Sequence, residues 1–327
     1  MICYRPFELH NHTQHSDGQF TVPGLMKAAA AYGYAGIALT DHNAVTGNAE
    51  VTPALETETG LRVIPGIEWT TFYGHLLVLG CDRFIDWRFV TPDTIDTALQ
   101  EIADAHGVAG IAHPREVGSP LMCGCNWEFR VTRWDLVSYI EVWSQEDPMS
   151  RTKNQLVMPW YDGLLNQGHR LAVSAGRDWH APDSKAHLLT ATYLGLSEGE
   201  VNTPNTLAAL RAGRTYITLG PTVDLTLWQE EGCFGLGETA SAGQGEVRVQ
   251  IGLDERQAVW EQWNIEVKTV RLVVNGETAA EQPFTGAPIS FSRELPRGWL
   301  RAELRGSHAR GNGDGEIIAL TSPIYLA

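Results

Sequence analysis

The sequence predicts an α/β barrel over residues 1–220, followed by a small all-β antiparallel sandwich over residues 221–327. Three observations support this fold class. Short apolar runs alternate with helical stretches in the first part, as in a barrel of parallel strands covered by helices. After Gly220 apolar residues alternate with polar ones, which is strand periodicity without helices. A chain of 327 residues with 43% hydrophobic residues can also bury the cores of two domains.

The first part contains short candidate strands separated by candidate helices. The strands are expected at Ile2–Leu9, Gly36–Thr40, Arg62–Ile67, His75–Leu79, Gly110–Ala112, Tyr139–Val142, Leu171–Ser174 and Leu189–Leu194. The helices are expected at Val22–Tyr32, Thr91–His106, Pro159–Asn166 and Thr206–Ala212. A proline near the first turn marks the start of the first helix, and Thr-Pro-Asp marks the start of the second.

The second part continues as strands to the end of the sequence. Apolar residues occupy every second position at Val223, Leu225 and Leu227, and again at Val247, Val249 and Ile251. Further strands are expected at Thr269–Val274, Leu300–Leu304 and Ile317–Leu326, the first of them ending in an Asn-Gly turn signal. We expect this part to buttress the barrel or to form an oligomer interface.

Charge and composition exclude several classes of protein. The 39 acidic and 24 basic residues give a net charge of −15, which disfavours nucleic acid as a partner. No basic segment followed by an apolar one begins the sequence, and no stretch approaches the roughly 20 apolar residues that cross a bilayer. Five cysteines, an odd number without C-x-x-C spacing, indicate reduced thiols. We therefore expect a cytoplasmic protein without a membrane partner; the oligomeric state stays open.

The strongest functional signal is the segment ELHNHTQHSDG, which follows the first expected strand. His10 and His12 are two residues apart, so both imidazoles point the same way from an extended chain and can reach one ion. The carboxyl ends of parallel barrel strands open on one face, so ligands placed there meet. His75 differs, because it begins its strand. The other residues of this kind at strand ends are Asp41, His42, Glu68, His113, Asp178 and His180.

An isolated histidine near a strand end is more often a hydrogen-bonded core or surface residue than a metal ligand. We apply that interpretation to His106, His169, His187 and His308, which lack a comparable setting. The other seven histidines, with Asp17, Glu68 and Asp178, would require many independent coincidences at strand ends. The sequence therefore predicts a metal cluster.

These motifs resemble those of the PHP (polymerase and histidinol phosphatase) superfamily over roughly residues 7–220. The matching motifs, in order, are His10-x-His12, Ser16-Asp17-Gly18, Thr40-Asp41-His42, Pro65-Gly66-Ile67-Glu68, His113-Pro114 and Asp178-x-His180. The phrase ALRAGRTYITLGPTVDLTL and the ending ALTSPIYLA look like the carbaryl hydrolase-type (CehA/McbA) branch of that superfamily. The resemblance implies a distorted (β/α)7 TIM-like barrel that holds two or three divalent metal ions.

The resemblance also implies how the ligands are shared. The first metal would take His10, His12, Glu68 and Asp178; the second would share Glu68 and take His75 and His113; the third would take Asp17, His42 and His180. Mixed imidazole and carboxylate ligands suit Zn, Mn or Fe. His15 lies outside these sets, close enough to replace Asp17 or to hydrogen-bond substrate.

The expected reaction is hydrolysis of an ester by a metal-activated water. No phosphate loop of the Walker type and no G-x-S-x-G nucleophile motif is present. Asp41 and His180 adjoin metal ligands and are candidate proton donors. Arg115 and Arg177 could bind an anionic ester, or could form structural salt bridges.

The substrate is expected to be a small-molecule ester. Phosphomonoester or phosphodiester hydrolysis leads, because it is common in the superfamily, and the branch resemblance keeps carboxylic ester or carbamate hydrolysis as the alternative. Trp127, Trp134, Trp143 and Trp179 would suit an apolar leaving group or serve only in packing. A non-catalytic binding protein with structural metals is a remote alternative, because nine or ten ligand candidates exceed what one structural ion needs.

Overall fold

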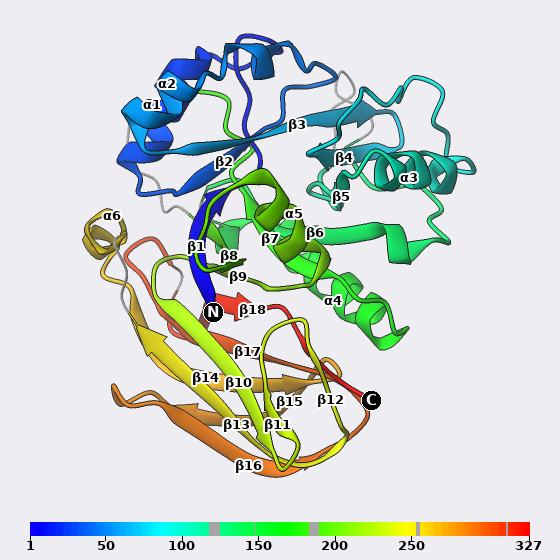
Figure 1. The fold of residues 1–327 in the computed structure, drawn as a ribbon. Helices are drawn as coiled ribbons and strands as arrows, with labels where there is room; N and C mark the ends of the chain where they lie inside the picture. Colours follow the sequence, from blue (N-terminus) through cyan, green and yellow to red (C-terminus); the bar gives the residue numbers. More distant parts are fainter. Residues whose placement is uncertain (118–124, 147, 183–189, 253–255, 312) are drawn as a thin grey trace.

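The computed structural model describes residues 1–117, 125–146, 148–182, 190–252, 256–311 and 313–327. It has a mixed α/β fold, with helices packed around strands in the first part and mostly strands in the second (Figure 1). The helices are α1 (Val22–Ala31), α2 (Pro53–Thr59), α3 (Ile95–Asp104), α4 (Thr152–Asn166), α5 (Thr203–Arg211) and the short α6 (Gln257–Trp260).

Strands of the first part belong to one large sheet. They are β1 (Ile2–Glu8), β2 (Gly36–Leu39), β3 (Arg62–Thr71), β4 (Gly74–Leu79), β5 (Val108–Ile111), β6 (Val137–Ser144), β7 (Ala172–Gly176), β8 (Ala191–Ser197) and β9 (Thr215–Thr218). The later strands are β10 (Thr222–Gln229), β11 (Gly232–Phe234), β12 (Thr239–Ala240), β13 (Gly243–Gly252), β14 (Glu266–Val274), β15 (Glu277–Pro283), β16 (Ile289–Leu295), β17 (Gly298–Ser307), β18 (Glu316–Thr321) and β19 (Ile324–Leu326).

Most of the expected elements are present within a few residues, and helix α4 shows the main difference. It begins at Thr152, so that Pro159, expected at its start, lies inside it. Proline removes one backbone hydrogen bond from a helix, but this helix buries Val157, Tyr161 and Leu164, and that packing supports it. Helix α2 and strand β9 were not among the elements expected in the first part.

The sheet of the first part is not all-parallel, in contrast to the expected parallel arrangement. Strands β1, β2 and β3 run parallel, as do β5, β6 and β7. Strand β4 is antiparallel to both β3 and β5. A two-residue turn, Phe72 and Tyr73, joins β3 to β4, and such a short connection requires antiparallel neighbours.

The strand path is open rather than closed into a barrel. Within the described residues it runs β12-β19-β17-β18-β9-β8-β1-β2-β3-β4-β5-β6-β7, with no backbone ladder beyond β7. Side-chain hydroxyl groups from Thr192, Thr215 and Ser322 form hydrogen bonds with the backbone of β7 instead, and we call this boundary the hydroxyl seam. Thr192 Oγ1 accepts from Ala175 N at 2.8 Å and donates to Ala175 O at 2.9 Å. Ser322 Oγ accepts from Val173 N at 3.0 Å, and Thr215 Oγ1 donates to Val173 O at 2.6 Å.

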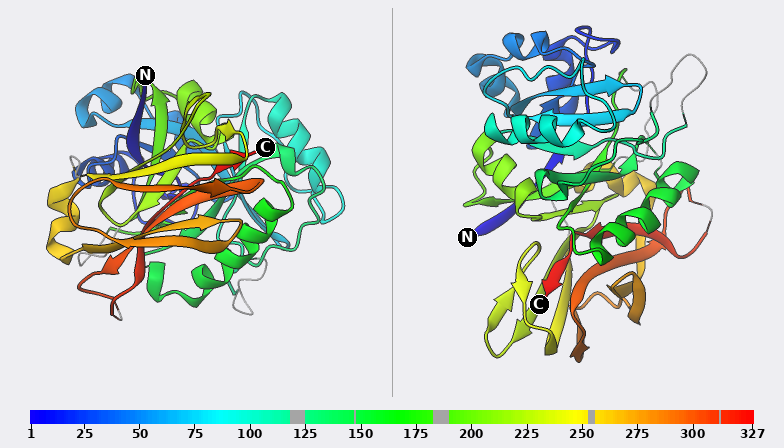
Figure 2. Two further views of the ribbon diagram at one scale, coloured as in Figure 1. Left: turned by 90° about the horizontal axis from the view of Figure 1, so that it is seen from below. Right: turned by 90° about the vertical axis from the view of Figure 1, so that its right-hand side faces the viewer.

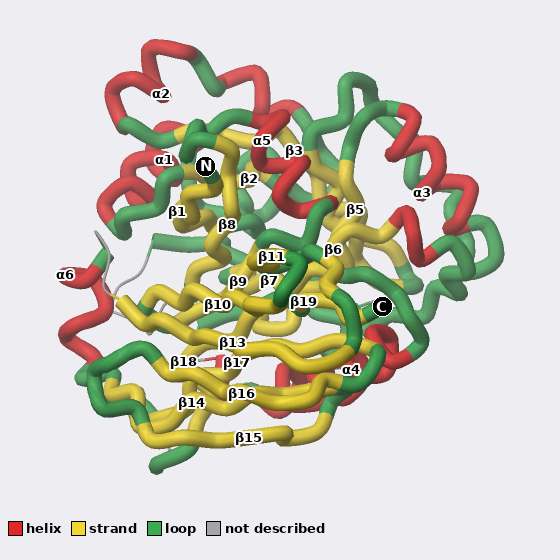
Figure 3. The backbone as a smooth tube through the Cα atoms, turned by 60° about the horizontal axis from the view of Figure 1, so that its bottom comes forward, coloured by secondary structure: helices red, strands yellow, loops and turns green. Residues whose placement is uncertain are grey.

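The strands after residue 221 lie together at one end of the molecule (Figure 2). Strands β11, β10, β13 and β16 form a four-stranded antiparallel sheet, and the other late strands extend the large sheet through the β18–β9 ladder. Figure 3 shows β10, β13 and β16 side by side. The alternation expected in β10 is present, because Val223, Leu225 and Leu227 are buried. The sandwich and the boundary at residue 220 stay predictions.

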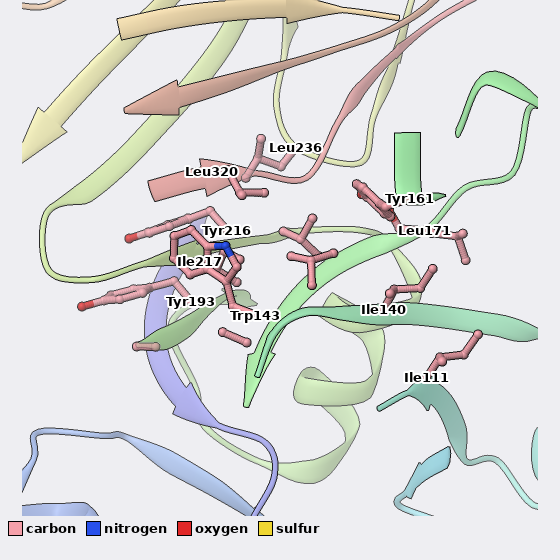
Figure 4. Close-up of a cluster of buried hydrophobic side chains, with 14 of the residues drawn as sticks. Ile111, Ile140, Trp143, Tyr161, Leu171, Tyr193, Tyr216, Ile217, Leu236 and Leu320 are labelled. Carbon is pink, nitrogen blue, oxygen red and sulfur yellow. The ribbon is translucent and has the colours of Figure 1, made fainter. Parts of the chain in front are cut away.

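The two parts share one hydrophobic core (Figure 4). Leu236 and Leu320 of the second part lie beside Tyr216 and Ile217, with Trp143 of the sheet below them. None of the described helices is long and apolar enough to cross a membrane. The four cysteines within the described ranges form no disulfide with one another, and Cys123 lies outside those ranges.

A buried ion network also joins the two parts. Arg301 on β17 contacts Asp162 on α4 and binds Glu303 at 2.8 Å, and Glu303 binds Arg305 at 2.7 Å. The side chains of Arg301 and Glu303 are each 4% exposed. Burial alone would raise the pKa of Glu303, but the guanidinium groups of Arg301 and Arg305 lower it below its ordinary value of 4.5.

We expect Glu303→Gln to lower the free energy of unfolding by about 3 kcal/mol at pH 7, because Arg301 loses part of its compensating charge. A carboxylate whose folded-state pKa is lowered stabilises the fold above pH 4.5 and loses this effect as the pH falls through that pKa. The difference should therefore shrink below pH 4.5. Urea unfolding of both proteins across pH measures it.

Glu281→Gln is the control. Glu281 also pairs with an arginine, Arg271, at 2.8 Å, but these side chains are 34% and 26% exposed. Its loss should cost less than about 1 kcal/mol. Equal effects of the two substitutions would mean that the buried network does not stabilise the junction.

Candidate metal centre

The strand ends of the first part converge at one edge of the sheet. Beyond β1 and β7 the chain continues as an isolated parallel bridge between Asn11 and Trp179, in which His12 N donates to Trp179 O at 2.9 Å. A second parallel bridge joins His42 to Glu68. The first bridge brings the segments after β1 and β7 together where no ladder joins these strands, and the second places the segment after β2 beside Glu68 within β3.

His75 reaches the same edge from the opposite direction. Strand β4 is antiparallel to β3, and His75 at its start pairs with Thr70 near the end of β3. The first residues of an antiparallel strand lie beside the last residues of its neighbour. The position of His75 at the start of its strand is therefore what places it at this edge.

The first group of potential ligands is His10, His12, Glu68 and Asp178. Glu68 Oε2 lies 3.2 Å from His10 Nε2 and 3.4 Å from His12 Nε2. Asp178 Oδ1 lies 3.4 Å and 3.1 Å from the same two nitrogens. Each of these four atoms is buried and has no hydrogen-bond partner among the described residues.

This spacing fits a shared metal ion. Donor atoms bonded to one ion at about 2.0–2.1 Å with tetrahedral angles lie roughly 3.3–3.4 Å apart. Buried polar atoms without partners cost free energy, which a bound cation would remove. Burial lowers the pKa of His12 to about 4, so its imidazole is neutral near pH 7 and offers a lone pair.

A second group uses the other oxygen of Glu68. Glu68 Oε1 lies 3.0 Å from His75 Nδ1 and 3.2 Å from His113 Nε2. Burial alone would raise the pKa of Glu68, but the facing imidazoles, His10 foremost, hold it well below its ordinary value. Glu68 therefore stands as a carboxylate between two ligand groups and could bridge two ions.

The third group is His12, Asp17, His42 and His180, the most exposed of the three. Asp17 Oδ1 lies 3.2 Å from His180 Nε2 and 3.6 Å from His42 Nε2. His180 Nδ1 lies 2.8 Å from the carbonyl oxygen of Asp178, and because that oxygen only accepts, Nδ1 must carry the proton. The lone pair of neutral His180 is then on Nε2, facing Asp17. The structure thus brings together all the ligand sets that the resemblance implies.

Glu141 was missed by sequence reasoning. It lies on β6, is 1% exposed, and Glu141 Oε2 accepts from His10 Nδ1 at 2.9 Å. This contact leaves His10 Nε2 for an ion. Gly176 makes room for the pair, because a Cβ there would lie 2.3 Å from Glu141 Oε2 and 2.6 Å from His10 Cβ. No motif surrounds Glu141, so the sequence carried no signal for it.

Two ligands have strained backbones. Asp178 has φ of 51° and His113 has φ of 23°, in a region that side chains with a Cβ rarely adopt. Such conformations cost of order 1–3 kcal/mol each and cluster at functional sites. Both strained residues belong to the ligand groups.

Asp41 and His15 have other partners in this structure. Asp41 is 1% exposed and accepts hydrogen bonds from Thr13 N at 2.6 Å, Thr13 Oγ1 at 2.8 Å and Ser16 Oγ at 2.9 Å. It holds the loop between His12 and Asp17. His15 bonds Thr46 and Glu50 at 2.9 Å each and belongs to none of the ligand groups.

The two expected anion-binding arginines lie against aromatic rings. The Arg115 guanidinium lies 5.2 Å from the centroid of the Trp160 ring. Arg177 is 1% exposed, and its guanidinium lies 3.7 Å from the centroid of the Trp179 ring. Trp127, Trp143 and Trp179 are buried in the core, while Trp134 stacks on His169. These tryptophans serve packing in this structure.

Lys153 is a second residue that the sequence did not reveal. It lies near the start of α4, has a side chain that is 10% exposed, and contacts Glu116. Burial lowers the pKa of Lys153 to about 8, against the opposing attraction of the Asp178 carboxylate. The ammonium group is therefore close enough to a ligand of the first group to feel its charge.

We expect Glu68→Gln to remove more than one ion per chain, because both oxygens of Glu68 face ligand groups. Elemental analysis of the purified protein measures this. Glu50→Gln is the matched control, since Glu50 contacts only His15 among these histidines; it should leave the metal content unchanged. Full metal content in Glu68→Gln would contradict a bridging role.

We expect Glu141→Gln to weaken metal binding about 10- to 100-fold without removing a ligand, because the contact orients His10. Titration with a competing chelator measures the affinity. An unchanged affinity would restrict Glu141 to packing.

Comparison with known proteins agrees with this geometry. Residues 8–91 match the family described as PHP domain. No curated protein matches the chain. A two-domain protein from Bacteroides vulgatus, described as containing a predicted PHP-like metal-dependent phosphoesterase, is similar in structure with a TM-score of 0.53 and 14% identity, over 97% of this chain and 95% of that one. At this identity the likeness is one of fold.

Two other solved structures are less similar. A candidate metal-dependent phosphoesterase from Bifidobacterium adolescentis has a TM-score of 0.40 and 18% identity, over 55% of this chain and 89% of its own. An amidohydrolase from Chromobacterium violaceum, with bound sulfate and no metal, has a TM-score of 0.35 and 20% identity, over 54% and 88%. The carbaryl hydrolase-type branch stays a prediction. The match to the PHP domain family covers residues 8–91, the part of the chain that carries His10, His12, Asp17, His42, Glu68 and His75.

Proposed function

We propose that this chain is a metal-dependent hydrolase of small-molecule esters, with phosphoesters as the preferred class. One observation carries the proposal: four buried nitrogen and oxygen atoms of His10, His12, Glu68 and Asp178 lie 3.1–3.4 Å apart across the group, without hydrogen-bond partners in the part of the chain that the structure describes. A cation bound among them would satisfy all four at once. The second and third groups would hold the further ions, for a total of two or three of Zn, Mn or Fe.

Bound divalent ions would supply a water of lowered pKa and polarise the ester oxygen on which charge develops. The residues of the chain position these ligands. Glu141 fixes His10, and Asp41 fixes the loop that carries Asp17. His180, with its proton held on Nδ1, is better placed as a ligand than as a proton donor.

An open site favours catalysis over a structural role for the metals. Structural metal sites are closed by protein ligands, whereas catalytic sites keep a position for substrate. Here Asp17, His42 and His75 line a cavity of about 960 Å³. A substrate could therefore reach the second and third groups, which argues against a purely structural metal protein.

The basic side chains near the site indicate which class of ester it could bind. Lys153 contacts Glu116, and the charge of Asp178 also acts on its ammonium group, which could attract a phosphate and so supports the phosphoesterase proposal. Arg115 and Arg177, which would have supported it further, lie against aromatic rings. This second observation keeps carboxylic ester or carbamate hydrolysis as the alternative. The cytoplasmic location and the lack of nucleic-acid and membrane partners also stay predictions.

Turnover of p-nitrophenyl phosphate, bis(p-nitrophenyl) phosphate and p-nitrophenyl acetate tests the proposal. We expect the wild type to hydrolyse a phosphate ester and His10→Ala to lose at least about 100-fold in kcat/KM, because it loses a ligand and the partner of Glu141. Chelation should abolish turnover and lower the Tm, since unscreened carboxylates repel. Turnover of acetate alone would select the alternative, and turnover unchanged by chelation would refute both.

Lys153→Met separates the two ester classes. If Lys153 attracts a phosphate, kcat/KM for p-nitrophenyl phosphate should fall about tenfold, the loss of one charge-assisted hydrogen bond, while any turnover of acetate changes little. Lys153→Arg should retain part of the phosphate activity. Lys27→Met is the control, because Lys27 pairs with Glu58 on the surface with both side chains 60% exposed.

A further inference from the structure

An aromatic cavity lies directly beside the metal groups. Its volume is about 960 Å³, and its lining includes Asp17, His42 and His75. Most of the remaining lining comes from two segments, the β3–β4 turn with Phe72 and Tyr73 and the segment Trp87–Thr91 that precedes α3. The cavity is thus continuous with the site at which the proposed hydrolysis occurs.

The walls of this cavity expose unusual apolar surface. Phe72 is 73% exposed and Phe89 is 81% exposed. Both belong to a chain with a net charge of −15, whose other phenylalanines in the metal-bearing part include fully buried ones such as Phe7. Exposed aromatic rings that gather at a cavity mark a place where an apolar ligand removes them from water.

The turn that carries Phe72 is held in place from below. Gly74 has φ of 130°, and a Cβ there would lie 2.8 Å from the Trp127 ring. The carbonyl oxygen of Tyr73 accepts from Glu128 N at 2.7 Å, and the Tyr73 ring packs edge-on against Phe129 at 5.8 Å. The same hairpin carries the potential ligands Glu68 and His75, so one element positions both the cavity wall and part of the ligand groups.

The charges of the cavity do not suit a polyanion. The basic side chain in its described lining is Arg88, whose guanidinium is held by Asp86 at 2.8 Å and 2.7 Å. Asp17 adds a negative charge at the metal end. A nucleotide or another polyphosphate would find little compensation here, whereas an uncharged ring would find aromatic walls on two sides.

We propose that the substrate is an ester whose alcohol part is an uncharged apolar group of one or two rings, seated between the Phe72–Tyr73 turn and the Trp87–Val90 segment. A phosphomonoester has a single organic group, which is its alcohol part, so this group must occupy the apolar cavity when the ester lies at Asp17, His42 and His75. The inference rests on the proposed hydrolase function for its chemistry, but it makes its own prediction about binding.

The kinetic test compares benzyl with ethyl phosphate, and benzyl with ethyl acetate, because the paired alcohols are similarly poor leaving groups. We expect the wild type to prefer the benzyl ester by about tenfold or more in kcat/KM, mainly through KM. Phe72→Ser and Phe89→Ser should each lose most of this preference, measured as the ratio of the two kcat/KM values within each variant. Phe84→Ser is the matched control, because Phe84 is 54% exposed but lines a different cavity.

A binding test keeps the inference separate from the proposed function. Calorimetry with benzylphosphonate and ethylphosphonate, which cannot be hydrolysed at an ester bond, should give a Kd at least about tenfold lower for the benzyl compound, and Phe89→Ser should remove the difference. Equal Kd values in the wild type, or a preference that survives in both Phe variants, would overturn the inference. Absence of turnover with a retained benzyl preference would overturn the hydrolase proposal alone.

Discussion

A single buried carboxylate organises the site. Glu68 is fully buried, and its two oxygens face imidazoles that come from four different strand ends or starts. Oε2 faces His10, His12 and His42, and Oε1 faces His75 and His113. A carboxylate without water needs such compensation, and the compensating groups must arrive from separate parts of the chain. The strands must therefore converge at Glu68 for the site to form, and the other features of the site depend on this convergence.

The sequence reveals potential ligands that lie close together in one motif, because an extended chain itself determines which way their side chains point. The pair His10 and His12 could be predicted in this way, and so could the recurrence of ligands at later strand ends. The strand assignments were close for the same reason, since periodicity reports which face of a strand is buried. His75 looked anomalous because periodicity does not reveal the direction of a strand. In a strand antiparallel to its neighbour, the first residues lie beside the neighbour's last residues, and this places His75 at the site.

Residues that act through long-range contacts left no such signal. Glu141 lies 131 positions from His10, and Lys153 sits on a helix amid unremarkable neighbours. Two candidates that adjoin potential ligands in the sequence make other contacts in this structure, and their proposed roles stay predictions. Asp41 stands next to His42, yet its oxygens accept from the loop backbone and hydroxyls, and Arg177 stands next to Asp178, yet its guanidinium lies on Trp179. Successive residues of a strand point to opposite faces, so a neighbour of a ligand is often not at the site.

The hydroxyl seam beside β7 has a consequence for cutting this chain into pieces. One of the bridging groups, Ser322, belongs to the last residues of the sequence, and strand β18 supplies the ladder partner of β9. A fragment that ends near residue 220 would keep all the potential metal ligands but would lack these partners. It would present two uncovered strand edges, which other copies of the fragment could extend into aggregates. The late strands thus act as a protective edge for the domain that carries the chemistry.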